Sequence, residues 1–76
     1  FVDYKSYLQE LVQSDKRTLE YRIIAEDGPS HDKKFTTRVY MDDILMGEGN
    51  GKSKKIAEQH SAEMALKKLA MKSMKF

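Results

Sequence analysis

The chain has 76 residues, enough for one small domain with a single core. Charged side chains make up 34% of it but the formal net charge is only +2, so bulk charge does not indicate a nucleic-acid partner and only the charge distribution can. The absence of cysteine excludes a disulfide scaffold and a thiolate zinc site and fits a reducing compartment. No apolar run approaches membrane-spanning length, so we expect no membrane partner. Because the chain begins with Phe1 rather than Met, we expect it to be part of a longer protein.

The first predicted element is a helix over Asp3 to Gln13, with Asp3 as its cap. Its apolar stripe is formed by Tyr4, Tyr7, Leu8, Leu11 and Val12. Its other face carries Lys5, Ser6, Gln9, Glu10 and Gln13. Most of these are uncharged donors and acceptors that can bond sugar hydroxyls and base edges. An ordinary solvated face is the simpler explanation when the helix is taken alone.

Alternating residues predict three strands joined by short turns. The strands are expected over Leu19 to Ala25, with Ile24 as an irregular position, over Phe35 to Met41, and over a short segment from Ile44 to Met46. The first turn, 27–32, contains Pro29, Ser30 and His31, which fit either a contact loop or routine hairpin residues. The second turn is Asp42-Asp43, where the favoured Asn-Gly or Asp-Gly is absent.

A second helix is predicted from Lys54 to Ala70, after glycines at 47, 49 and 51 that we interpret as a flexible turn. Ser53 is its expected cap. Small residues at helical spacing, Ala57, Ser61, Ala62 and Ala65, would let this helix lie close against a sheet. Residues 71–76 are expected to form a fraying tail.

The start of this helix carries Lys52, Lys54 and Lys55, although cations are disfavoured near a helix N-terminus. No capping box compensates, because Ile56 occupies the position where Glu or Gln would be needed. Backbone amides, a hydroxyl and three ammonium groups at one place suit a phosphate oxygen. The alternative is a solvated lysine cluster that aids solubility; the glycines and the cap favour anion binding.

These elements predict an α+β fold in the order α-β-β-β-α, with a three-stranded antiparallel sheet and both helices on one face. In such a fold the first helix, the first hairpin loop and the start of the last helix can reach a common rod-like polyanion. Double-stranded RNA fits this description. His31 and His60 do not form a zinc site, and no nucleophile and base can be placed together, so we predict neither catalysis nor a cofactor within the chain.

Residues 3 to 70 resemble the double-stranded RNA-binding domain, and most closely the C-terminal domain of bacterial ribonuclease III. The similarity is carried by Asp3-Tyr4-Lys5-Ser6, Leu8-Gln9-Glu10, Gly28-Pro29-Ser30-His31, Gly47 to Glu58, Ser61-Ala62 and Ala65-Leu66. We therefore assign 1–70 to this domain and 71–76 to a tail. Two positions differ from the family pattern. Ser61 replaces the usual Ala and should pack, and Asp42-Asp43 replaces an Asn-Gly-like turn.

The resemblance implies that RNA is contacted from three places. The implied contacts are Ser6, Gln9, Glu10 and Gln13 in one minor groove, Pro29, Ser30 and His31 in the next, and Lys52, Ser53, Lys54 and Lys55 on major-groove phosphates. It also implies a cytoplasmic parent endoribonuclease that processes RNA, including ribosomal RNA, with its Mg²⁺-binding acids in a separate dimerising domain. The fragment itself would then be a monomer that binds RNA without cutting it. The alternatives are a protein-interaction module, which would tend to lack these lysines, a domain of a non-nuclease RNA-binding protein, and a stand-alone enzyme.

Overall fold

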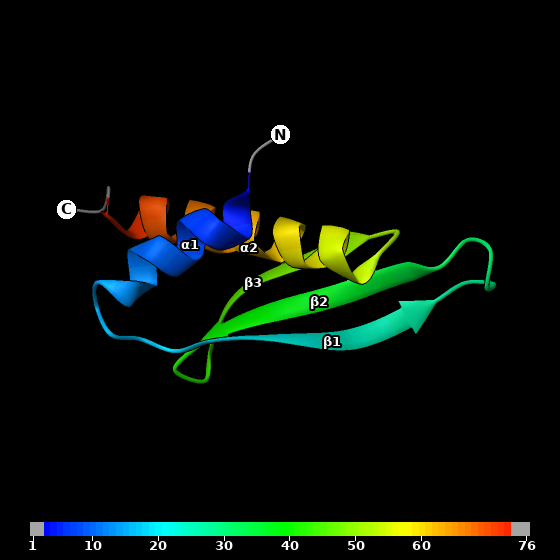
Figure 1. Ribbon diagram of the computed structural model, residues 1–76, viewed down its shortest axis with the longest axis horizontal. Helices are drawn as coiled ribbons and strands as arrows, with labels where there is room; N and C mark the ends of the chain where they lie inside the picture. The colour runs from blue at the N-terminus through cyan, green and yellow to red at the C-terminus, as the bar shows by residue number, and fades with distance from the viewer. Residues whose placement is uncertain (1–2, 74–76) are drawn as a thin grey trace.

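The computed structural model describes residues 3–73 and has the predicted order of elements. These are α1 (Tyr4–Gln13), β1 (Leu19–Asp27), β2 (Lys34–Met41), β3 (Ile44–Gly51) and α2 (Lys54–Ser73). The strands form an antiparallel sheet in the order β1-β2-β3. Both helices cover one face of this sheet and leave the other face open (Figure 1). The predicted α+β fold is therefore confirmed.

The core lies between the helices and the sheet. It is formed by Leu8 and Val12 of α1, Val39 and Met46 of the sheet, and Ala62 and Ala65 of α2. Two members of the predicted apolar stripe on α1, Tyr7 and Leu11, are instead 57% and 43% exposed. Only Leu8 and Val12, four positions apart, are buried on α1. The helix therefore contacts the core along one narrow line of its surface, and Tyr7 and Leu11 lie beside that line.

The glycine segment was wrongly interpreted as a turn, because β3 continues through it to Gly51, five residues past the predicted end at Met46. A Cβ on Gly47 would lie only 2.7 Å from the Ala65 amide nitrogen, and a Cβ on Gly49 only 2.6 Å from the His60 carbonyl carbon. These glycines are therefore required by the close approach of α2 to β3 rather than by a change of chain direction.

The small side chains predicted on α2 lie at this contact. Ala57, Ser61, Ala62 and Ala65 are all fully buried. The Ser61 hydroxyl donates a 2.7 Å hydrogen bond to the Glu58 carbonyl oxygen, so this polar group is satisfied within its own helix. The expectation that serine packs at this position is confirmed.

Two predicted irregularities of the sheet are explained by the structure. The pairing register shifts between Ile23 and Ala25, so Ile24 is the extra residue of a β-bulge. Asp42 and Asp43 have φ angles of 50° and 68°, the left-handed conformation that a tight hairpin turn needs at both central residues. Asp residues tolerate this conformation better than most residue types, so the turn forms without glycine.

The last helix ends at Ser73 rather than at the predicted Ala70. The division into a domain and a tail after residue 70 stays a prediction, and 74–76 lie outside the described residues. Neither helix in the described part of the chain has the length and hydropathy that a membrane crossing requires.

Candidate nucleic-acid interface

The N-terminus of α2 is built as predicted. The Ser53 hydroxyl accepts a 3.1 Å hydrogen bond from the Ile56 amide, and the Ser53 carbonyl accepts a 3.0 Å bond from the Ala57 amide. Ser53 is therefore the N-cap. The flanking Lys52, Lys54 and Lys55 are exposed, and the first turn contains no acidic residue. Positive side chains and the positive end of the helix dipole are thus concentrated at one place.

These lysines form no ion pair within the described residues of the domain. Within the described part of the chain, no carboxylate lies within 4.0 Å of the Lys52, Lys54 or Lys55 ammonium groups. The cations that do form ion pairs are Lys5, Arg17, Arg22, Lys33, Arg38 and Lys67. The ammonium groups at the start of α2 can therefore approach an external anion without first breaking an internal pair.

The polar face of α1 presents exposed Ser6, Gln9, Glu10 and Gln13, which follow the i, i+3/i+4, i+7 spacing of one helix side. The Ser6 hydroxyl donates a 2.7 Å hydrogen bond to the Asp3 carboxylate. Because the hydroxyl hydrogen is used in this bond, the Ser6 oxygen remains available as an acceptor. This face therefore offers neutral acceptors and donors together with the carboxylate of Glu10.

The one cation on α1 is used inside the domain. The Lys5 ammonium lies 2.6 Å from the Glu58 carboxylate of α2 and 4.9 Å from the centroid of the Tyr21 ring. Both contacts hold Lys5 at the junction of α1, α2 and β1. The exposed face of α1 consequently carries no cation for a phosphate and is better suited to hydroxyl groups.

The loop between β1 and β2 carries the exposed residues Pro29, Ser30 and His31. It is closed by a 2.9 Å hydrogen bond from the Asp32 amide to the Pro29 carbonyl oxygen. Gly28 precedes it with a φ of +94°, and a Cβ there would collide with the Asp32 carbonyl oxygen. The loop is thus a tight, preformed projection rather than an extended linker.

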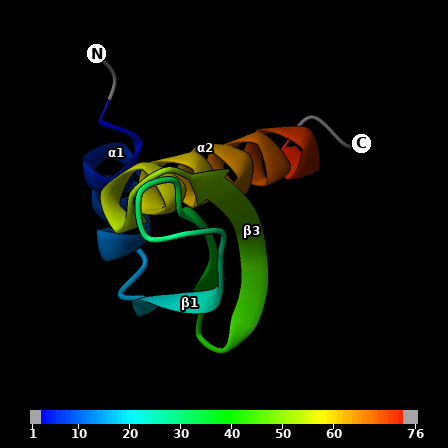
Figure 2. The same ribbon diagram turned by 90° about the vertical axis from the view of Figure 1, so that its right-hand side faces the viewer.

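The three predicted places follow one another along the length of the domain. The domain measures 45 × 22 × 21 Å, and in Figure 1 the loop forms one end of the long axis, the first turn of α2 comes next, and α1 follows. Figure 2 looks along this axis from the loop end and shows the loop in front of the start of α2, with α1 to one side. The lysines lie between α1 and the loop, and none of the predicted contact residues in those two places is a Lys or an Arg.

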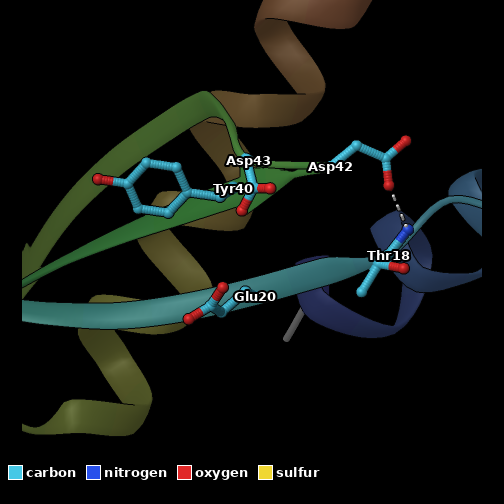
Figure 3. A pocket seen from close by; sticks show the side chains of 5 residues that line it. All are labelled: Thr18, Glu20, Tyr40, Asp42 and Asp43. Carbon is cyan, nitrogen blue, oxygen red and sulfur yellow. Dashed lines mark hydrogen bonds between the residues drawn. The ribbon is translucent and has the colours of Figure 1, made fainter.

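The β2–β3 turn carries the two adjacent acids Asp42 and Asp43. A shallow hollow beside the β2–β3 turn is lined by Thr18, Glu20, Tyr40, Asp42 and Asp43 (Figure 3). The Asp42 carboxylate accepts a 3.0 Å hydrogen bond from the Thr18 amide and pairs with Arg17 at 3.2 Å, while Glu20 pairs with Arg22 at 2.9 Å. These contacts brace the turn, and the acids at it are paired with Arg17 and Arg22.

Among residues 3–73, no three His, Asp or Glu side chains lie close enough together to hold a metal ion. We derive no catalytic step from these residues.

One functional pair was missed by the sequence reasoning. The Gln59 amide of α2 bonds to Asp3 and to the first backbone amides of α1, with donor–acceptor distances from 2.8 to 3.3 Å. Gln59 was not singled out because its partners are more than 50 positions away. No local spacing signal could have revealed this contact.

The match to known proteins agrees with this geometry. Residues 4–69 match the family described as the double-stranded RNA binding motif, and the chain belongs to that family. It is similar to ribonuclease 3 of Onion yellows phytoplasma (strain OY-M), with 49% identity over 69 residues, and of Bacillus cereus (strain AH187), with 52% identity over 69 residues. The expected resemblance to bacterial ribonuclease III is confirmed. The alignments cover 91% and 90% of this chain but 29% and 28% of those proteins, so it spans less than a third of their length.

Solved structures show the same fold in other organisms. The structure of Arabidopsis HYL1 superposes with a TM-score of 0.78 at 38% identity, covering 88% of this chain and 96% of that one. The structure of Dicer from Pichia stipitis superposes with a TM-score of 0.71 at 28% identity, covering 86% of this chain and 32% of that one. The fold is therefore shared with proteins other than ribonuclease 3.

Proposed function

We propose that this domain binds double-stranded RNA by its shape. In this proposal α1 enters one minor groove, the β1–β2 loop enters the next, and the start of α2 contacts phosphates across the major groove between them. The observation that carries the proposal is the unpaired lysine cluster at a capped helix start, flanked along the long axis by α1 and the loop.

The chemistry of each surface suits its proposed groove. Ammonium groups gain affinity by displacing counterions from phosphates, whatever the sequence of the duplex. The wide minor groove of A-form RNA displays 2′-hydroxyls, which neutral donors and acceptors can bond. Because the α1 cation is already paired with Glu58, α1 is suited to these hydroxyls and not to phosphates.

We further propose that the domain is the substrate-binding part of a ribonuclease III-like endoribonuclease. Support comes from the relatives named ribonuclease 3, which are longer than this chain. In this proposal Mg²⁺-dependent cleavage, dimerisation and RNA processing in the cytoplasm belong to the parent protein. This chain would supply binding of the duplex and no catalytic group.

A binding titration tests the proposal. The 76-residue chain is titrated against a fluorescent RNA duplex of about 20 base pairs, longer than the span of about 16 that such domains contact, and against the matching DNA duplex and single strand. We expect the RNA duplex to bind more tightly than either competitor at physiological salt. Equal affinity for RNA and DNA duplexes would contradict the proposal, because binding would then be explained by nonspecific electrostatic attraction alone.

The alternative is a module that binds proteins instead of RNA. Such a module has no need of unpaired cations at the start of α2, so the free Lys52, Lys54 and Lys55 argue against it. Absence of any RNA-duplex binding in the titration would favour this alternative.

A further inference from the structure

The first turn of α1 is capped by a side chain from the other helix. The Gln59 side-chain oxygen accepts hydrogen bonds from the amides of Tyr4 at 2.8 Å and Lys5 at 3.3 Å. Its nitrogen donates a 2.8 Å bond to the Asp3 carboxylate. The first amides of a helix have no partner within the helix, so these bonds satisfy groups that would otherwise need water.

Asp3 transmits this contact to a proposed RNA-binding residue. The carboxylate that receives the Gln59 bond also accepts bonds from the Ser6 amide at 3.2 Å and the Ser6 hydroxyl at 2.7 Å. Bonds from Gln59 and then from Ser6 hold the pKa of Asp3 at about 2, which keeps it ionised as an acceptor. The direction of the Ser6 hydroxyl therefore depends on where Gln59 places Asp3.

Gln59 is also close to the lysine cluster along α2. It lies six residues after the Ser53 cap, fewer than two helical turns away. The neighbouring Glu58 adds the 2.6 Å ion pair with Lys5. The start of α1 is thus tied to the same segment of α2 that presents Lys54 and Lys55.

We propose that Gln59 is a positioning residue that holds the groove-facing side of α1 in register with the lysines and so determines the preference for RNA over DNA. This inference rests on the proposed function. The buried Leu8 and Val12 dock α1 one and two turns further on, so the helix stays attached without Gln59. What Gln59 specifies is the placement of the first turn, including Ser6.

The proposed role of Gln59 affects the hydroxyl contacts of α1 but not the phosphate contacts of the lysines. Phosphate contacts from Lys52, Lys54 and Lys55 do not pass through Gln59, so its loss should leave the salt dependence of the binding constant unchanged. Hydroxyl contacts from α1 need the correct register and exist only with RNA. Loss of Gln59 should therefore weaken RNA binding while DNA binding stays the same.

The test uses Gln59→Ala with Glu63→Ala as the matched control. Glu63 lies on the same helix and, within residues 3–73, its one ion pair is the 3.6 Å i, i+4 contact with Lys67. Each variant is titrated with RNA and DNA duplexes of identical sequence and length over a range of salt. We expect Gln59→Ala to lower the RNA-to-DNA affinity ratio about tenfold with an unchanged salt slope, whereas Glu63→Ala keeps the ratio of the parent.

The outcomes distinguish this inference from the proposed function. A parent domain without a preference for RNA defeats the proposed function itself. A parent with that preference, combined with Gln59→Ala that retains it or loses RNA and DNA affinity equally, overturns the inference alone. If Gln59→Ala does not fold, Asp3→Ser decides by the same ratio, because serine keeps an N-cap oxygen but removes the carboxylate that joins Gln59 to Ser6.

Discussion

Gly49 of β3 lies directly against the backbone of Ser61 in α2, and a side chain at position 49 would collide with the Ser61 amide nitrogen. Ser61 is fully buried at this contact. The strand and the helix therefore approach as closely as two backbones can. Because Lys54 and Lys55 begin this same helix, the contact helps to set the position of the backbone that carries them.

Gly49→Ala should destabilise the domain by about 1–3 kcal/mol, since the added Cβ overpacks a contact made by backbone atoms that cannot move aside. Urea unfolding followed by circular dichroism measures the change. Asn50→Ala is the control, because Asn50 is exposed and its one side-chain bond among the described residues is a 3.3 Å bond to Thr36. Equal stability of the two variants would show that the backbones of α2 and β3 are not in close contact at Gly49.

Lys54→Ala should weaken binding to every RNA duplex alike. We expect the slope of log K against log salt to flatten by about one unit, the effect of one lost phosphate contact. Stability should hold or rise slightly, because the change removes a cation from the positive end of a helix dipole. Lys67→Ala, which removes a cation paired with Glu63, should leave both affinity and slope unchanged. An unaltered slope in Lys54→Ala would contradict a phosphate contact.

Glu10→Ala distinguishes two explanations by the sign of its effect. If the carboxylate only repels RNA, its removal strengthens binding. If it accepts a hydrogen bond from a ribose hydroxyl, its removal weakens RNA binding by about 0.5–3 kcal/mol and leaves DNA binding unaffected or improved. We expect the second result, with Glu10→Gln in between because an amide keeps an acceptor oxygen. Tighter RNA binding by Glu10→Ala would exclude the hydroxyl contact.

Asp3 should contribute to acid unfolding. Hydrogen bonds from Gln59 and Ser6 lower its pKa from 3.8 to about 2, so the folded state favours the ionised form. The stabilisation is present above the unfolded pKa and is lost as pH falls from about 4 to about 2. Asp3→Ser should therefore show a shallower loss of thermal stability over this interval than the parent. If the melting temperatures of both proteins fall equally over this pH interval, the hydrogen bonds to Asp3, including the Gln59–Asp3 bond, do not lower its pKa.

Tyr21 should limit stability in alkali. Burial, followed by the charges of Glu58 and Asp3, raises its pKa to about 12, and its hydroxyl has no hydrogen-bond partner within the described residues. The stabilisation is present below the unfolded pKa of 10 and is lost as pH rises from 10 to about 12.

Tyr21→Phe removes both effects. At neutral pH it should be as stable as the parent or more stable by up to about 1 kcal/mol, because it removes an unsatisfied buried hydroxyl. Its advantage should grow between about pH 10 and 12, as measured by urea midpoints in alkaline buffers. An advantage that stays constant with pH would show that Tyr21 ionises equally in the folded and unfolded chain.

The elements, both helix caps and the family followed from the sequence because each depends on residues a few positions apart. Asp3 and Ser53 accept from amides three residues ahead, which is the spacing that a cap requires. The alternation that predicted β1 also marked Ile24 as irregular, and Ile24 is the bulge. The lysines of the candidate interface were found in the same way, from their position beside a local cap.

The tertiary structure decided what depends on distant partners. Whether the glycine segment is a turn or a strand depends on what lies against it, and α2 lies against Gly47 and Gly49. Which lysines form ion pairs depends on where the fold brings the acids. Lys5 pairs with Glu58, 53 positions away. Lys54 forms no ion pair within the described residues, although its charge contributes to lowering the pKa of Glu26. The capping of α1 by Gln59 likewise arises only when the two helices pack, because Gln59 belongs to α2 and the amides that it caps belong to α1.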